Sequence, residues 1–171
     1  MRPVTTSDDE TLRRVFDAVL AVARADLPRA PQSDAPAVSL ELVAVERPWR
    51  DRWRVAAVCV RGTVVSILVN ASTLPALLQD RGGPLARVLA HELAHVTLRH
   101  APGDHVPTIE LEADTLGAYY AERAGYPCRR SATWGIQGWA VRQWPDPAAY
   151  RAAVHAACAG AERGVRPPRR H

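Results

Sequence analysis

The amino-acid sequence predicts an α+β fold in which one helix precedes a small sheet and several helices follow it. Apolar residues recur at helical spacing from Leu12 to Ala23, whereas three later runs have the alternation or the β-branched residues typical of strands. Helical spacing returns from Pro84 onward. The chain has 171 residues, of which 47% are hydrophobic, and this suits a sizeable core. We therefore expect a single compact domain over residues 1–164.

The charge of the chain gives little reason to expect a nucleic-acid partner. The net charge is +4, and the 22 basic residues are all arginines, a composition typical of a GC-rich bacterial genome. Part of the basic excess lies at the C-terminus, so we expect a disordered, solvated basic tail over residues 165–171. Nucleic-acid binding through this tail is the less favoured alternative.

The first expected helix begins at a capping box formed by Ser7 and Glu10. The apolar positions from Leu12 to Ala23 fall on one face, and Pro28 ends the pattern. We expect this helix to pack on the sheet as a scaffold, with a linker inside the domain over residues 28–37.

Three strand-like runs follow, and their order along the chain predicts a small antiparallel β-meander. The runs span residues 38–46, 52–60 and 63–70. Arg61 and Gly62 read as a tight hairpin turn, because glycine readily supplies the positive φ that such turns need.

The next run, residues 84–100, reads as a helix that carries His-Glu-Leu-Ala-His at positions 91–95. Pro84 suits the first turn of a helix. A spacing of four residues places the imidazoles of His91 and His95 on one face, where both can bind one Zn²⁺. Glu92 lies at the edge of that face, within reach of a water molecule on the metal. Two surface histidines with an acidic neighbour are the alternative, but the apolar flanks bury this helix, and buried polar groups need partners.

A second helical run, residues 108–121, offers a third metal ligand. Glu110 and Asp114 are four residues apart and therefore share a face of this helix. We expect Glu110 to be the third ligand and Asp114 to orient a ligand histidine. An ordinary surface carboxylate is an equally weighted alternative for Asp114. Glu112 points nearly the opposite way and is expected in solvent.

The remaining boundaries come from capping residues. Thr108 is expected to cap the second metal helix and Gly125 to end it. Two more helices are expected, one over residues 131–143 and one from Asp146, with proline in its first turn, to Gly164.

Residues 63–127 resemble a known family of enzymes. His-Glu-x-x-His at 91–95, the pair Arg99-His100, and Glu-x-x-Ala-Asp at 110–114 are similar to the gluzincin metallopeptidases of the HtpX, BepA and CAAX-prenyl-protease type. This chain departs from that family in its short connection between His95 and Glu110 and in lacking a membrane segment, so the family's membrane-linked substrates do not carry over. The compact spacing also resembles the soluble ImmA/IrrE metallopeptidases, the second choice.

The resemblance implies a zincin-like fold with one Zn²⁺ per chain, held by His91, His95 and Glu110. It also implies that Glu92 is the general base of a metallopeptidase acting on a peptide or protein substrate. Two other classes of function stay open: a metal-dependent hydrolase or tailoring enzyme with a non-peptide substrate, and a catalytically silent zinc-binding regulatory module. The candidates for stabilising an oxyanion are Tyr119, Tyr120, His105, Arg142 and His155.

The strand expected at Thr63–Asn70 precedes the metal helix and could bind an extended peptide along a free edge. Its apolar residues are nearly continuous, which fits burial on both faces. The alternative is a central strand, paired on both sides, with no edge to offer.

The three cysteines, Cys59, Cys128 and Cys158, are scattered and form no Cys-x-x-Cys motif. Cys59 and Cys158 read as buried thiols, and an odd, unclustered set argues against a disulfide framework and for a reducing compartment. No run approaches the roughly 18 apolar residues of a membrane span, and the N-terminus lacks a leader pattern. We therefore expect a cytoplasmic protein. The oligomeric state is not predicted.

Overall fold

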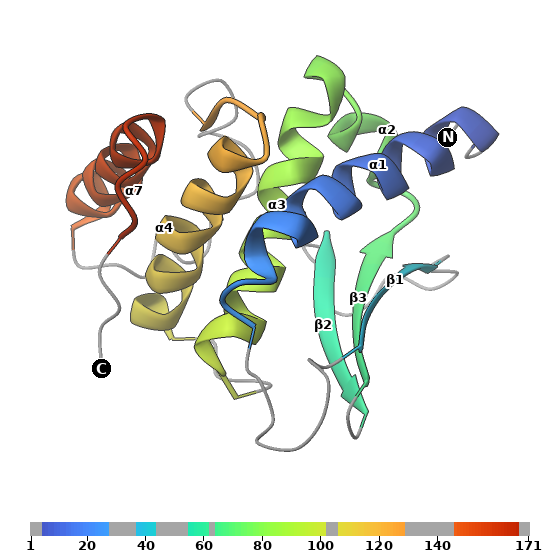
Figure 1. Cartoon of the computed structure of the whole chain (residues 1–171), viewed down its shortest axis with the longest axis horizontal. Coiled ribbons are helices and arrows are strands. Elements are labelled where there is room, and N and C mark those ends of the chain that lie inside the picture. Colours follow the sequence, from blue (N-terminus) through green and yellow to red (C-terminus); the bar gives the residue numbers. More distant parts are fainter. Residues whose placement is uncertain are drawn as a thin grey trace.

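The computed structural model describes residues 5–27, 37–43, 55–61, 64–101, 106–128 and 146–167. In these residues the helices gather on one side of a small three-stranded sheet (Figure 1), which confirms the predicted α+β class. The elements are α1 (Thr6–Ala23), β1 (Ala37–Val43), β2 (Ala56–Arg61), β3 (Val64–Asn70), α2 (Leu74–Leu77), a 3₁₀ turn (Asp80–Gly82), α3 (Gly83–Leu98), α4 (Pro107–Arg123) and α7 (Pro147–Glu162).

The sheet is mixed, and the predicted antiparallel meander is wrong. Its strand order is β1-β3-β2, with β2 antiparallel and β1 parallel to the central strand β3. Ile67 of β3 lies opposite Val58 of β2 on one side and Leu40 of β1 on the other. A meander needs a tight turn at each connection, whereas residues 44–55 separate β1 from β2 and can carry the chain from one edge of the sheet to the other.

The central position of β3 explains its nearly continuous apolar sequence. Val65, Ile67 and Val69 are buried on one face, and Ser66 on the other face is buried as well. Because β3 pairs along its length with both neighbours, it has no free edge. The hypothesis that Thr63–Asn70 binds a peptide by strand addition is therefore wrong.

The N-cap of helix α1 is Thr5, two residues before the predicted N-cap Ser7. The Thr5 hydroxyl accepts a hydrogen bond from the Asp8 N–H at 3.2 Å, and the Asp8 carboxylate accepts one from the Thr5 N–H at 2.8 Å. Thr5 and Asp8 have the same spacing as the predicted pair, so the box closes one half-turn earlier. The buried face of α1 packs against α3 and joins the main core through Leu12, Val15, Phe16, Val19, Leu20 and Ala23.

Helix α3 lies at the centre of the fold, between α1, α4 and the sheet (Figure 1). Its contact with α4 is close because Gly117 has no side chain. A Cβ atom at Gly117 would lie 2.8 Å from the backbone nitrogen of His91. The glycine therefore lets the two helices meet directly beside the expected metal ligands.

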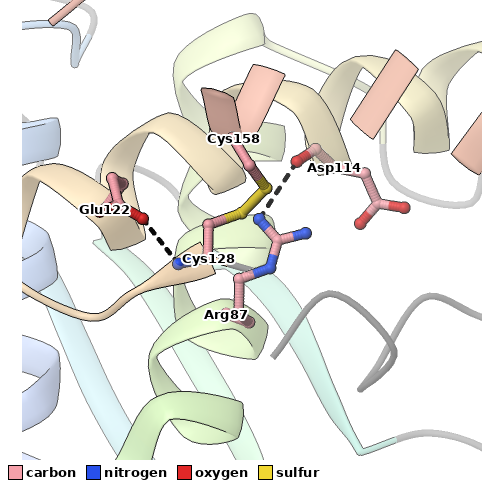
Figure 2. The surroundings of a disulfide bond; sticks show 5 residues. All are labelled: Arg87, Asp114, Glu122, Cys128 and Cys158. Carbon is pink, nitrogen blue, oxygen red and sulfur yellow. Dashed lines mark hydrogen bonds between the residues drawn. A yellow bond between two sulfur atoms is a disulfide. The ribbon is translucent and has the colours of Figure 1, made fainter. Parts of the chain in front are cut away.

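Helix α7 packs on the far side of α4, and a disulfide joins Cys158 of α7 to Cys128 in the segment that follows α4 (Figure 2). The prediction of a buried thiol at Cys158 and the argument against a disulfide are therefore wrong, because residues 30 apart in sequence meet only through the packing of α7 on α4. The bond removes the basis for predicting a reducing compartment. Cys59, on β2, is a free thiol and only half buried.

The start of the predicted basic tail lies against the fold. Arg166 forms an ion pair with Asp26, their side-chain nitrogen and oxygen lying 2.6 Å apart. This ion pair holds Arg166 against the fold, while residues 168–171 lie outside the described residues, so the disordered tail over residues 165–171 stays a prediction.

Most predicted helix ends are close to the observed ones. Gly125 and Gly164 have φ of +87° and +74° just beyond α4 and α7, and the Asp146 side chain caps α7. Thr108 does not cap α4, since the helix already begins at Pro107. The helix expected at 131–143 lies outside the described residues. Among the helices that the structure describes, none combines the length and apolarity that a bilayer crossing requires.

Candidate metal centre

Helix α3 presents two histidine side chains to the same point. His91 and His95 are one turn apart, and their Nε2 atoms lie 3.0 Å from each other. Both side chains are partly accessible, with 19% and 17% of their surface exposed, whereas the neighbouring Leu93 and Ala94 are fully buried. The helix is thus anchored in the core by its buried apolar positions, while the two imidazoles lie on its partly exposed side.

Helix α4 brings a carboxylate to the same point. The Oε2 atom of Glu110 lies 3.3 Å from Nε2 of His91 and 3.8 Å from Nε2 of His95. A tetrahedral Zn²⁺ with bonds of about 2.0–2.1 Å places its ligand atoms about 3.3 Å apart. The three distances in this cluster, 3.0, 3.3 and 3.8 Å, bracket that value. His91, His95 and Glu110 could therefore hold a metal ion.

The outer nitrogens of both imidazoles already have partners. Nδ1 of His91 lies 2.8 Å from Oδ1 of Asp114, and Nδ1 of His95 lies 2.8 Å from Nδ1 of His100. A neutral imidazole that donates from Nδ1 has only a lone pair at Nε2. Two such lone pairs and a carboxylate oxygen repel one another unless a cation lies between them, so the donor set fits a metal.

Asp114 occupies the place that an orienting acceptor would need. It is 2% exposed, so it is not an ordinary surface carboxylate. One oxygen faces His91, and the other accepts a hydrogen bond from the hydroxyl of Tyr150, on α7. Three elements, α3, α4 and α7, therefore determine the position of the His91 ring.

A second set of contacts, not expected from the sequence, surrounds His95. His100 follows the end of α3, and its Nε2 atom lies 3.4 Å from Oε2 of Glu112. Glu112 was expected in solvent, but its side chain is only 32% exposed and turns towards His100. The helix-face argument failed here because it ignored the turn at Arg99 after α3, which places His100 on the side of α4 that Glu112 occupies.

The ionisable side chains of the cluster shift one another's pKa values. Burial lowers the pKa of His91, but Asp114 first, and then Glu110 and Glu92, raise it to about 10 in the metal-free protein. Burial raises the pKa of Glu110, yet its hydrogen bonds with His91 and His95 hold it well below its usual range. Without a metal, a proton on His91 therefore partly replaces the missing positive charge.

Beside the cluster, Arg87 joins α3 to α4 under the disulfide (Figure 2). Its guanidinium is buried and donates a hydrogen bond to the backbone carbonyl of Asp114 at 3.4 Å. Burial lowers the pKa of Arg87, while the negative charge of Asp114 partly offsets this effect. On the same side, the carboxylate of Glu122 accepts a hydrogen bond from the backbone N–H of Cys128 at 2.6 Å. These contacts support the segment of α4 that carries Asp114.

The expected general base and oxyanion groups fall in different surroundings. Glu92 is half buried on α3, and its charge helps to raise the pKa of the adjacent His91. Tyr120 is buried away from the cluster and donates to Asp26 at 2.8 Å, so it belongs to the scaffold. Tyr119 packs against the main core, and His155 is exposed on α7. His105 and Arg142 lie outside the described residues.

The sequence did not predict the contacts that four neighbours make around the cluster. These residues are Arg87, His100, Glu112 and Tyr150. His100 carried a signal, since it follows the histidine pair closely and belongs to the Arg-His motif. Tyr150 carried none, because it lies 36 residues from Asp114 and reaches it only through the packing of α7. Searches of protein-family models, of curated proteins and of solved structures find no match to this chain.

Proposed function

We propose that the chain is a zinc-dependent metallopeptidase with His91, His95 and Glu110 as metal ligands and Glu92 as general base. The observation that carries the proposal is the convergence of two Nε2 atoms and one carboxylate oxygen within 3.0–3.8 Å. Three protein ligands of the His₂Glu type leave a fourth position for water or substrate, which is the pattern of catalytic rather than structural zinc sites.

Bound zinc would act there as a Lewis acid that acidifies a water molecule and polarises a carbonyl group. The carboxylate of Glu92 would take a proton from the attacking water and pass it to the leaving nitrogen. Glu92 adjoins His91 but does not belong to the cluster of His91, His95 and Glu110 that could hold the metal. Its carboxylate can therefore act as a base without binding the metal. Asp114 would keep His91 in the tautomer that binds through Nε2.

The sheet offers an extended substrate a different edge from the one expected. Among the described strands, β2 lies at an edge of the sheet and packs against the metal helix α3. Val60, near its end, is 50% exposed. A peptide paired with the outer edge of Ala56–Arg61 would run beside the metal helix, which makes a peptide a better substrate than a compact small molecule.

The experiment compares wild-type protein with Glu92→Gln and with Glu10→Gln, the same change at an exposed position of α1. Each protein is loaded with one equivalent of Zn²⁺, its metal content is measured, and cleavage of an unfolded protein substrate is followed. We expect both variants to retain zinc. Glu92→Gln should lose at least 100-fold of activity, in line with general-base catalysis of about 10²–10⁴-fold, and Glu10→Gln should lose none.

The outcomes separate the three classes of function. A wild-type protein that binds no zinc refutes the metal centre. Zinc binding without cleavage of any peptide contradicts the peptidase and favours a non-peptide substrate or a regulatory module. Cleavage that persists in Glu92→Gln refutes the role of that carboxylate.

A further inference from the structure

The turn that ends helix α3 folds His100 back over His95, a proposed metal ligand. Arg99 has φ of +58°, a left-handed conformation that a residue with a side chain seldom adopts. The backbone N–H of His100 then donates to the carbonyl of His95 at 3.0 Å. The turn brings the two rings together, with centroids 4.9 Å apart and planes at 71°.

The contact between these rings determines which nitrogen of each ring carries the proton. If His95 binds a metal through Nε2, its proton is on Nδ1 and is donated across 2.8 Å to Nδ1 of His100. Nδ1 of His100 must then accept, so the proton of His100 is on Nε2. That nitrogen faces the carboxylate of Glu112 at 3.4 Å, which can accept it.

We propose that His100 and Glu112 form a positioning pair that sets the tautomer and the ring orientation of His95. The inference rests on the proposed zinc site and adds residues that act on it indirectly. His91 is oriented directly by the carboxylate of Asp114. His95 is instead oriented by the neutral imidazole of His100, which in turn faces the carboxylate of Glu112. Outer partners of metal-binding histidines commonly change metal affinity by about 10–100-fold.

The burial of His100 supports this role over a purely local one at the helix end. Its side chain is 9% exposed although it lies beyond the last turn of α3, and both of its ring nitrogens face polar partners. A residue that only ended the helix would need its backbone but not its ring nitrogens. The choice of side chain therefore distinguishes the two roles.

The first test exchanges the ring for side chains with and without an acceptor. His100→Asn places an amide oxygen near the position of Nδ1, whereas His100→Leu has a similar bulk and no acceptor. His155→Leu makes the same change at an exposed position of α7. Zinc affinity is measured by competition with a chromophoric chelator, and the visible spectrum of the Co²⁺ form reports the geometry of the ligands.

We expect His100→Leu to weaken zinc binding by about 10–100-fold and to change the Co²⁺ spectrum. His100→Asn should recover most of the affinity, and His155→Leu should match the wild type. Equal affinity in all four proteins overturns the proposal. Equal losses in His100→Asn and His100→Leu also overturn it, because they point to the helix end alone.

The second test needs no variant and holds even if the His100 variants fail to fold. Long-range ¹H–¹⁵N NMR of wild-type protein with labelled histidine and bound zinc identifies the protonated nitrogen of each ring. We expect a proton on Nδ1 of His95 and on Nε2 of His100, and a proton on Nδ1 of neutral His100 overturns the relay. A protein that binds no zinc refutes the proposed function instead, so the two failures are distinguishable.

Discussion

Replacing Gly117 by alanine tests whether the approach of two helices sets the metal centre. The added Cβ would lie 2.8 Å from the backbone nitrogen of His91 and 3.0 Å from both the carbonyl carbon of Ala90 and the Cα of His91. These neighbours are backbone atoms of a buried helix. They can give way only if α3 and α4 move apart.

Two opposing effects decide the magnitude. Alanine inside a helix is more favourable than glycine by about 1 kcal/mol. Overpacking a core commonly costs about 1–3 kcal/mol, and the upper end applies here because no flexible side chain can move aside. We expect Gly117→Ala to lower the free energy of unfolding by about 2 kcal/mol. For a chain of this size that corresponds to a fall in Tm of about 4–8 °C.

The assay combines urea unfolding of the metal-free protein with zinc affinity measured by chelator competition. Gly160→Ala is the matched control, because it adds the same methyl group inside helix α7, where the new Cβ would meet Val165 only at ordinary contact distances of 3.4 and 3.8 Å. Gly160→Ala should be neutral or stabilising. Gly117→Ala should also weaken zinc binding, because the clash moves His91 of α3 away from Glu110 of α4.

The reasoning is refuted if Gly117→Ala unfolds at the same urea concentration as the wild type, or at a higher one. Such a result would mean that the helices have room to spare. Lost stability with unchanged zinc affinity would contradict only the link between helix spacing and the ligand positions.

The disulfide, the Asp114 contact and the charge on His91 lead to three more measurements. Replacing both Cys128 and Cys158 by serine should lower the free energy of unfolding by about 3–4 kcal/mol, because the bond closes a loop between residues 30 apart; an unchanged urea midpoint contradicts this. Asp114→Asn should weaken zinc binding by about 10–100-fold, and unchanged affinity in the chelator assay would remove the orienting role of this carboxylate. The folded pKa of His91 in metal-free protein is about 10, above the unfolded value of about 6.5, so its stabilisation is complete below about pH 6.5 and is lost as the pH rises through about 10. Thermal melts with a chelator should show the Tm of the wild type falling across that range, and a flat or rising wild-type profile, or an equal fall in His91→Gln, would disprove it.

The outline of the candidate site could be predicted because its ligands depend on short-range geometry. His91 and His95 share a face of any helix that contains them, and the same is true of Glu110 and Asp114. Only the docking of two consecutive helices was needed to join these pairs. The small residue Gly117 makes that docking close.

Reasoning from short-range geometry did not predict the strand order of the sheet. The pattern of residues 64–70 predicts a strand buried on both faces, and β3 is buried on one face at Val65, Ile67 and Val69 but on the other only at Ser66. The same pattern does not say which strands flank it, because strand order depends on long connections rather than on side-chain alternation. The edge assignment and the antiparallel meander failed for that reason.

The sequence by itself determined the α+β class, the position of the metal helix and the identity of a His₂Glu cluster that could hold a metal. These follow from periodicities of two and of 3.6 residues, which act over neighbouring turns. Only the tertiary structure decided the strand order, the Cys128–Cys158 bond and the contacts of His100 and Tyr150 around the ligands. Each of these depends on how an element packs against another or on how the chain turns between them. Packing of that kind is set by the shape of the whole core, which no local spacing encodes.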